Sequence, residues 1–155
     1  MPTPFDPDAV LRKPLMANLS TVAADGAPRN APVWFAWEGG ALSMLATEGN
    51  ASVTRLRADP RCAVEIVDYD NARGVLRHVG LRGRAEIVPM DIALFRRLLH
   101  RYLGPEPDWN PWFIREIAHI DHPDGRLIRL APDSVFTNDV SFFRTGPDLA
   151  RPAPG

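Results

Sequence analysis

Apolar and polar residues alternate along much of the first 90 residues, a period of two that is typical of β-strands. We expect a first strand over residues 15–22 and a second over 31–37. Asp25-Gly26 lies between them and predicts a hairpin, because glycine readily takes a positive φ. A second turn, Glu38-Gly39-Gly40, leads to a third strand over 41–47. These three strands are predicted to form a meander.

The pattern then changes to a helix and returns to strands. Asn50 is a plausible N-cap for a helix that reaches Ala58, and Asp59-Pro60 stops it. A strand is expected over 62–68, followed by a long strand over 75–88. The inward positions of that long strand are predicted to be Val79, Leu81, Gly83, Ala85 and Ile87.

The last third of the sequence holds one amphipathic helix, over residues 91–103. A final strand is expected over 126–130, resuming near Val135, and a short helix lies within the first 14 residues. One face of the amphipathic helix carries Ile92, Phe95, Leu99 and Tyr102.

Hairpins dominate this order of elements, which favours a mainly β fold: a closed antiparallel barrel with a few flanking helices. We expect one domain over residues 1–143. Residues 144–155 are rich in proline and small residues and are predicted to form a flexible tail.

Composition narrows the class of protein. A chain of 155 residues with a net charge of −1 has one core and no overall field that would recruit nucleic acid or an acidic membrane. The single cysteine, Cys62, lies in an apolar run and is expected to be buried, which excludes a disulfide framework within the chain. With no long apolar segment or signal-peptide core, we expect a cytoplasmic protein.

Three segments in order, STVAADGAPRNAPVWFAW, LATEGNASVTRLRADPRCAV and RHVGLRGRAEIV, resemble the pyridoxamine 5'-phosphate oxidase-like family. The resemblance covers about residues 15–103, with a weaker match at RLIRLAPDSVF. It implies a six-stranded antiparallel split β-barrel with Greek-key connections that works as a homodimer. It also implies FMN, or the deazaflavin coenzyme F-420 as the alternative, in a groove between subunits.

The resemblance assigns roles to several positions. Backbone groups of Pro32, Val33 and Trp34 flank the flavin ring in such proteins, and Thr47 matches a threonine near the cofactor. His78 stands where the family often has a glutamine that touches the ring. The alternative for Trp34 is simple packing, and the alternative for His78 is exposure to solvent.

The chain departs from the family at the phosphate. A basic Ser-Arg-Lys tripeptide usually binds it, whereas this chain has Asn50, Ala51 and Ser52. Arg55 lies one turn further on the same helix face and is the candidate replacement, together with the amides of the helix N-terminus. The alternative for Arg55 is an ion pair with Asp59.

The function implied by the resemblance is an FMN-binding oxidoreductase that acts on a small molecule. A deazaflavin-dependent reductase and a non-catalytic flavin- or haem-binding barrel are the alternatives. No side chain stands out as an acid or base, so we name no catalytic residue.

Other candidates remain open. His119 and His122, with Asp121 and Asp124, fit no strong zinc pattern, and we expect no metal site. Arg82 and Arg84 either line the groove between subunits or belong to an exposed strand face. Trp109 and Trp112 belong to a lid, a dimer contact or a packed short helix.

Overall fold

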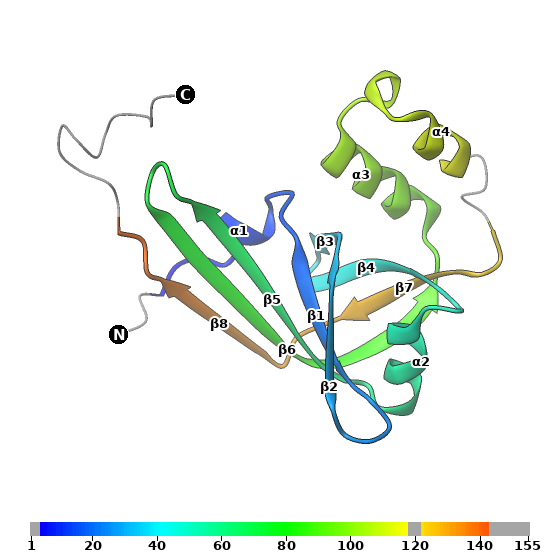
Figure 1. Ribbon diagram of the computed structural model, residues 1–155, viewed down its shortest axis with the longest axis horizontal. Coiled ribbons are helices and arrows are strands. Elements are labelled where there is room, and N and C mark those ends of the chain that lie inside the picture. Colours follow the sequence, from blue (N-terminus) through cyan, green and yellow to red (C-terminus); the bar gives the residue numbers. More distant parts are fainter. Residues whose placement is uncertain (1–3, 118–121, 143–155) are drawn as a thin grey trace.

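The computed structural model describes residues 4–117 and 122–142 of the chain, so the expected tail lies outside the described residues. Strands dominate it, as Figure 1 shows. The strands are β1 (Ala17–Val22), β2 (Pro28–Val33), β3 (Phe35–Glu38), β4 (Ala41–Thr47), β5 (Arg61–Asp70), β6 (Val75–Pro89), β7 (Gly125–Leu130) and β8 (Ser134–Asp139). The helices are α1 (Asp8–Leu11), α2 (Ala51–Ala58), α3 (Ile92–Leu103), α4 (Pro111–Ile117) and the 3-10 turn η1 (Glu106–Asp108).

One bent strand closes the sheet into a barrel. Only Trp34 separates β2 from β3, yet β2 pairs with β1 and β3 pairs with β4. The sheet order β2-β1-β5-β6-β7-β4-β3 therefore begins and ends with parts of the same strand. The pairing order of the predicted three-strand meander is confirmed, but the second strand pairs with β1 only before Trp34 and with β4 only after it.

The second interrupted strand is β7–β8, both halves of which pair with β6. When β2–β3 is counted as one strand and β7–β8 as another, the eight segments make six antiparallel strands, which confirms the expected fold class. Three residues, 131–133, lie opposite only Gly83 and Arg84 of β6, so the break is a β-bulge. Pro132 is tolerated there because a bulge leaves its residue out of the ladder.

The barrel interior is the main core. The predicted inward face of β6 is confirmed, with Val79, Leu81 and Ala85 buried and Ile87 packed at the edge of the core. Cys62 is buried as expected, and its burial raises the pKa of the thiol to about 11. The largest fully buried side chains are Phe35, Leu11, Leu42, Met44, Ile66, Leu81, Leu98 and Ile128.

The buried face of α3 overlaps the one its sequence pattern indicated, with Leu99 buried and Phe95 and Tyr102 partly buried, but it is turned toward Leu94 and Leu98. Leu94, Leu98 and Leu99 are buried, whereas Ile92 is 41% exposed. Leu94 and Leu98 pack in a second cluster with Leu127 of β7. The helix turns this face inward because the barrel wall, which the sequence pattern does not reveal, lies on that side.

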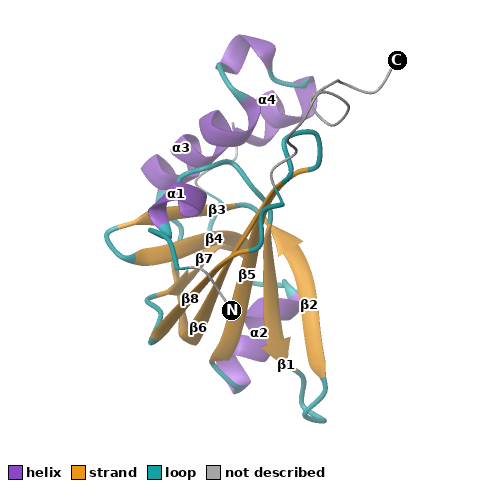
Figure 2. Ribbon diagram, turned by 90° about the vertical axis from the view of Figure 1, so that its left-hand side faces the viewer, coloured by secondary structure: helices purple, strands orange, loops and turns teal. Residues whose placement is uncertain are grey.

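The helices cover opposite ends of the barrel. Figure 2 shows α3 and α4 together beyond β3 and β4, and α2 at the far end, where it packs against β1 and β6. No helix in residues 4–117 or 122–142 combines the length and apolar character needed to cross a bilayer.

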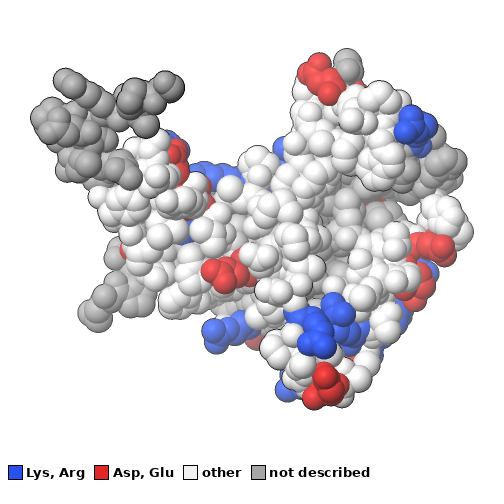
Figure 3. Space-filling view, in the orientation of Figure 1, with Lys and Arg blue, Asp and Glu red and all other residues white. Residues whose placement is uncertain are grey.

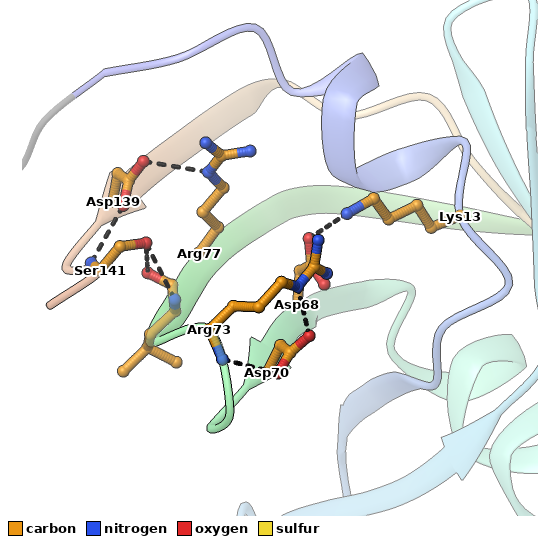
Figure 4. A network of polar contacts seen from close by, with 8 residues as sticks. Lys13, Asp68, Asp70, Arg73, Arg77, Asp139 and Ser141 are labelled. Atoms are coloured by element: carbon orange, nitrogen blue, oxygen red, sulfur yellow. Dashed lines mark hydrogen bonds and ion pairs between the residues drawn. The ribbon is translucent and has the colours of Figure 1, made fainter. Parts of the chain in front are cut away.

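The barrel splits where β5, β6 and β8 extend away from α3 and α4 (Figure 1). There the inward side chains change from apolar to charged: Asp68 binds Lys13, and Arg77 binds Asp139 with a 3.0 Å Nε–Oδ2 distance (Figure 4). Ser141 donates its backbone N–H to Asp139 and holds the end of β8 in place. Charged pairs do not pack into an apolar interior, so the sheet opens at this end.

Gly83 allows β6 to pass close to the bulge, and we expect it to be required. A Cβ there would lie 3.0 Å from Leu130 Cδ1 and 3.2 Å from the Asp133 backbone nitrogen. Gly83→Ala should lower the free energy of unfolding by about 1–3 kcal/mol, measured in urea. Gly80→Ala is the matched control: its Cβ meets nothing closer than 3.8 Å, so stability should hold or rise by up to about 1 kcal/mol. Equal losses in both variants would contradict the steric argument.

Candidate functional site

The end of β4 and the start of α2 bring four predicted residues together. The Asn50 N–H donates to the Thr47 carbonyl at 2.9 Å, which turns the chain directly after the strand. The Asn50 side-chain oxygen then accepts from the Ser52 N–H at 2.8 Å, so the predicted N-cap is confirmed. Thr47 and Asn50 are exposed, Ser52 is buried, and Arg55 follows one turn later.

Arg55 is half-buried and held by two neutral hydroxyl groups. Its Nε donates to Thr21 Oγ1 at 2.7 Å, and its Nη2 donates to Ser52 Oγ at 3.2 Å. Thr21 and Ser52 are 2% and 8% exposed, so the guanidinium is fixed from its buried side. Among the described residues, Arg55 forms no ion pair with a carboxylate.

The expected alternative, an Arg55–Asp59 pair, is wrong. Asp59 instead forms a two-point ion pair with Arg61, with Nη2–Oδ2 at 2.6 Å and Nε–Oδ1 at 3.0 Å. Hydrogen bonds from Arg61 lower the pKa of Asp59 to about 2. A guanidinium with fixed geometry and no internal counterion is a ready binding group for an anion.

Trp34 lies at the bend between β2 and β3 and packs against the helices. Its ring stacks on Tyr102 of α3, with 4.7 Å between centroids and 2° between planes, and on Phe113 of α4 at 5.9 Å. Val33 is half-buried and Pro32 is exposed on the outer face. The strand predicted to flank a cofactor ring therefore ends against an aromatic wall.

The Tyr102 hydroxyl connects this wall to the barrel. It donates to the Leu15 carbonyl at 2.7 Å and accepts from the Phe35 N–H at 3.1 Å. Burial raises the pKa of this phenol above its ordinary value, so it stays protonated through the neutral range. Tyr102 thus fixes both the entry to β1 and the first residue of β3.

His78 lies apart from the α2 cluster. Its Cα partners are Val67 on β5 and Asn138 on β8, so its side chain faces outward, two strands away from β1. The ring packs against Phe136 at 5.4 Å, and Nε2 lies 3.9 Å from Glu65 Oε1. Within one chain, then, His78 does not join Thr47, Asn50, Ser52 and Arg55.

Sequence reasoning missed two residues of the site. Thr21 occupies a buried position of β1, in line with Ala17 and Leu19, and a polar residue on such a face is the signal that could have found it. Tyr102 was assigned to the packing face of its helix, but its hydroxyl contacts are made with segments far away in sequence.

The two tryptophans that had several interpretations have different environments. Trp109 is 5% exposed and donates its indole N–H to the Gly104 carbonyl, which makes it a packing residue. Trp112 is 51% exposed. His119 and Asp121 lie outside the described residues, and within those residues no group of three or more potential metal ligands occurs.

The family model for pyridoxamine 5'-phosphate oxidase matches residues 8–139, which is most of the chain. The chain belongs to the pyridoxamine 5'-phosphate oxidase family. No curated protein matches it in sequence.

Solved structures agree with this family membership. A protein named F420 reductase is 29% identical, with a TM-score of 0.67 over 86% of this chain and 98% of that one. A conserved hypothetical protein from Mycobacterium tuberculosis is 22% identical, with a TM-score of 0.71 over 89% and 86%. An FAD-binding protein from Mesorhizobium loti is 19% identical, with a TM-score of 0.58 over 86% and 91%. The last two likenesses show the fold alone.

In this member of the pyridoxamine 5'-phosphate oxidase family, we expect the Tyr102 hydroxyl to make a measurable contribution to the free energy of unfolding. Tyr102→Phe removes the partner of the Leu15 carbonyl and the Phe35 N–H, so we expect a loss of about 1–3 kcal/mol in the free energy of unfolding. Thr54→Val is the control, because it removes a hydroxyl that is exposed on α2 and should change stability by less than about 0.5 kcal/mol. Similar unfolding curves for the two variants would show that the hydroxyl does not hold the bend.

Proposed function

We propose that the chain is an oxidoreductase for a small molecule and that Arg55 binds the phosphate of its flavin-type cofactor. The observation that carries this proposal is the guanidinium held between the Thr21 and Ser52 hydroxyls without a carboxylate partner among the described residues. Family membership supplies the cofactor class, and Arg55 lies beside the place where the family usually has its basic tripeptide.

The residues at the start of α2 fit the phosphate of such a cofactor. A fixed guanidinium loses little conformational freedom when an anion binds, so more of the interaction energy appears as affinity. Thr47 and Asn50 lie at the turn that begins α2. The Pro32–Trp34 segment, which is the family's usual neighbour of the ring, ends against α3 and α4 at the other end of the barrel. The stacked rings of Trp34, Tyr102 and Phe113 form an apolar boundary that keeps water from one side of this strand.

The lost basic tripeptide favours the deazaflavin coenzyme F-420 over FMN. A phosphate monoester such as that of FMN carries about −1.5 to −2 charges at neutral pH. A phosphate diester, the linkage in coenzyme F-420, carries one charge, which a single guanidinium matches. The 29% identity to a protein named F420 reductase, across nearly all of that protein, supports the same choice. FMN remains the second candidate because the family has flavin-binding members.

Either cofactor would supply hydride transfer, whereas the protein supplies binding, orientation and electrostatics. The chain's own part is to hold the phosphate through Arg55 and to keep the strand at Trp34 in place. We propose that it does so in a reducing cytoplasm, in keeping with its lone buried Cys62.

Arg55→Ala tests the proposal directly. Loss of a hydrogen bond to a charged group costs about 1.5–3 kcal/mol, so the affinity for coenzyme F-420 or FMN should fall about ten- to hundredfold. Riboflavin lacks the phosphate, so its affinity should barely change. Fluorescence titration of the purified protein with all three compounds measures both effects.

Arg57→Ala is the matched control on the same helix. Arg57 already pairs with Glu48 at 2.9 Å and is half-exposed, so its loss should leave all three affinities unchanged. If Arg55→Ala weakens riboflavin as much as FMN, Arg55 is not the phosphate group. Tight binding of a cofactor that no reductant or substrate turns over would support the non-catalytic alternative instead.

We also propose that the chain works as a symmetric homodimer through the outer face of β1, β5, β6 and β8. That face exposes four large apolar side chains, and grouped exposed apolar residues are typical of protein interfaces. A second copy there would also cover His78, which lies apart from Arg55 within one chain. The four residues, which we call the apolar outer face, are Met16 (46% exposed), Val67 (36%), Tyr69 (57%) and Phe136 (43%).

Light scattering should give the mass of two chains at micromolar concentration. Val67→Lys with Tyr69→Lys should convert the protein to a monomer, because burying unpaired charges in an interface is costly. Ile92→Lys with Ile114→Lys is the control, since these residues are equally exposed but lie on α3 and α4. A native protein that stays monomeric at all concentrations would rule out the dimer.

A further inference from the structure

A basic surface lies on the outer side of the barrel, away from the side on which Arg55 lies. The strand register puts Ser20 of β1 opposite Asn30 of β2 and opposite Ala63 of β5, and Ala63 opposite Arg82 of β6. On the next rung, Arg61 of β5 stands opposite Arg84 of β6. Arg61, Arg82 and Arg84 are all exposed, on the face opposite to the buried core positions.

Two adjoining hollows mark the same surface. One has a volume of about 240 Å³ and is lined by residues of β1, β2 and β5, including Arg61. The other has a volume of about 170 Å³ and reaches Arg29 and Asn30. Both hollows share Ser20 and Pro28, so they form one depression, which we call the outer groove. Figure 3 shows blue side chains gathered on the lower part of the molecule, where these strands converge in Figure 1.

The positive charge beside the outer groove is neutralised only in part, by Asp59, whose carboxylate pairs with Arg61 and also interacts with the charge of Arg84. Within residues 4–117 and 122–142, the Arg82 and Arg84 side chains form no hydrogen bond or ion pair, and Arg29 donates only to the Pro28 carbonyl. The remaining carboxylate on this part of β6, Glu86, stands opposite Arg129 of β7. The surface therefore keeps an excess of positive charge in a protein whose net charge is −1.

The spacing of the arginines suits a small molecule with several charges. Residues on neighbouring strands lie about 5 Å apart, and alternate residues on one strand lie about 7 Å apart. Arg82 and Arg84 can thus meet two negative charges of one ligand, beside Arg61, whose charge is shared with Asp59. A groove of this volume fits a compact molecule, whereas a nucleic acid needs an extended basic track.

We propose that the outer groove binds a small polyanion, either a phosphate ester with more than one phosphate or a polycarboxylate. Thr21 also lines the larger hollow, but its hydroxyl points to the inner side of β1, where it binds Arg55, whereas Ser20 faces outward. The two sites therefore lie on opposite sides of this strand. The outer groove does not depend on the cofactor. Guanidinium groups bind both kinds of ligand, whose negative charges are phosphates in one and carboxylates in the other.

The test uses the protein without cofactor and two probes, inorganic tripolyphosphate and a triglutamate peptide, in calorimetric titrations at low ionic strength. Binding of at least one probe is expected, weakening as salt is added. Arg82→Gln with Arg84→Gln should weaken that binding about five- to thirtyfold, the sum of two exposed charge contacts. The probe that binds more tightly identifies the source of the natural ligand.

Arg12→Gln with Arg115→Gln is the matched control, because it removes the same net charge from the residue that follows α1 and from α4. It should leave the affinity within about twofold, and so should Arg55→Ala, which separates this site from the proposed phosphate site. If neither probe binds, or if the control pair weakens binding as much as Arg82→Gln with Arg84→Gln, the proposal is overturned. Failure of FMN or coenzyme F-420 to bind would leave this result unaffected.

Discussion

Barrel closure depends on a single strand that changes partners at Trp34. Residues before Trp34 pair with β1 and residues after it pair with β4, so the two ends of the sheet are joined covalently by one residue. The bend is held by the Tyr102 hydroxyl, which bonds the backbone on its far side, and by the stacking of Trp34 on Tyr102. Without closure, β2 and β3 would be exposed sheet edges, which are prone to pair with other chains.

The same closure explains the environment of Arg55. It fixes β1 over the end of α2, and this brings the Thr21 hydroxyl within 2.7 Å of the guanidinium. A half-buried charge without a carboxylate is costly, and two neutral acceptors reduce that cost without removing the charge. Stability alone would be better served by an acidic partner or an apolar residue, so the unneutralised charge is what relates Arg55 to ligand binding.

Local patterns predicted most of the elements but not how they meet. Alternation identified β1, β4, β5 and β6, and Asn50 was correctly expected to begin α2, because these features depend on residues close together in sequence. The break at Trp34 was missed because a strand that changes partners keeps its period of two. The phosphate role of Arg55 stays a prediction, and its environment could not be predicted locally because its partner Thr21 lies 34 residues away. Asp59 pairs with Arg61, two residues away, and not with Arg55. The backbone at Asp59 is extended, which turns its carboxylate away from the helix.

The outer face of the sheet carries apolar residues where β5, β6 and β8 extend away from α3 and α4. Near α2 the same face carries arginines. In an isologous dimer each copy presents the same face, so an apolar centre would leave the arginines of both copies at the rim, which is the usual arrangement of interfaces. Like charges facing each other across a rim weaken association unless an anion lies between them. A polyanion in the outer groove would then bind the dimer more tightly than the monomer, and by linkage it would strengthen the dimer by the same factor. The two proposals for this face are therefore coupled through the charges of Arg82 and Arg84.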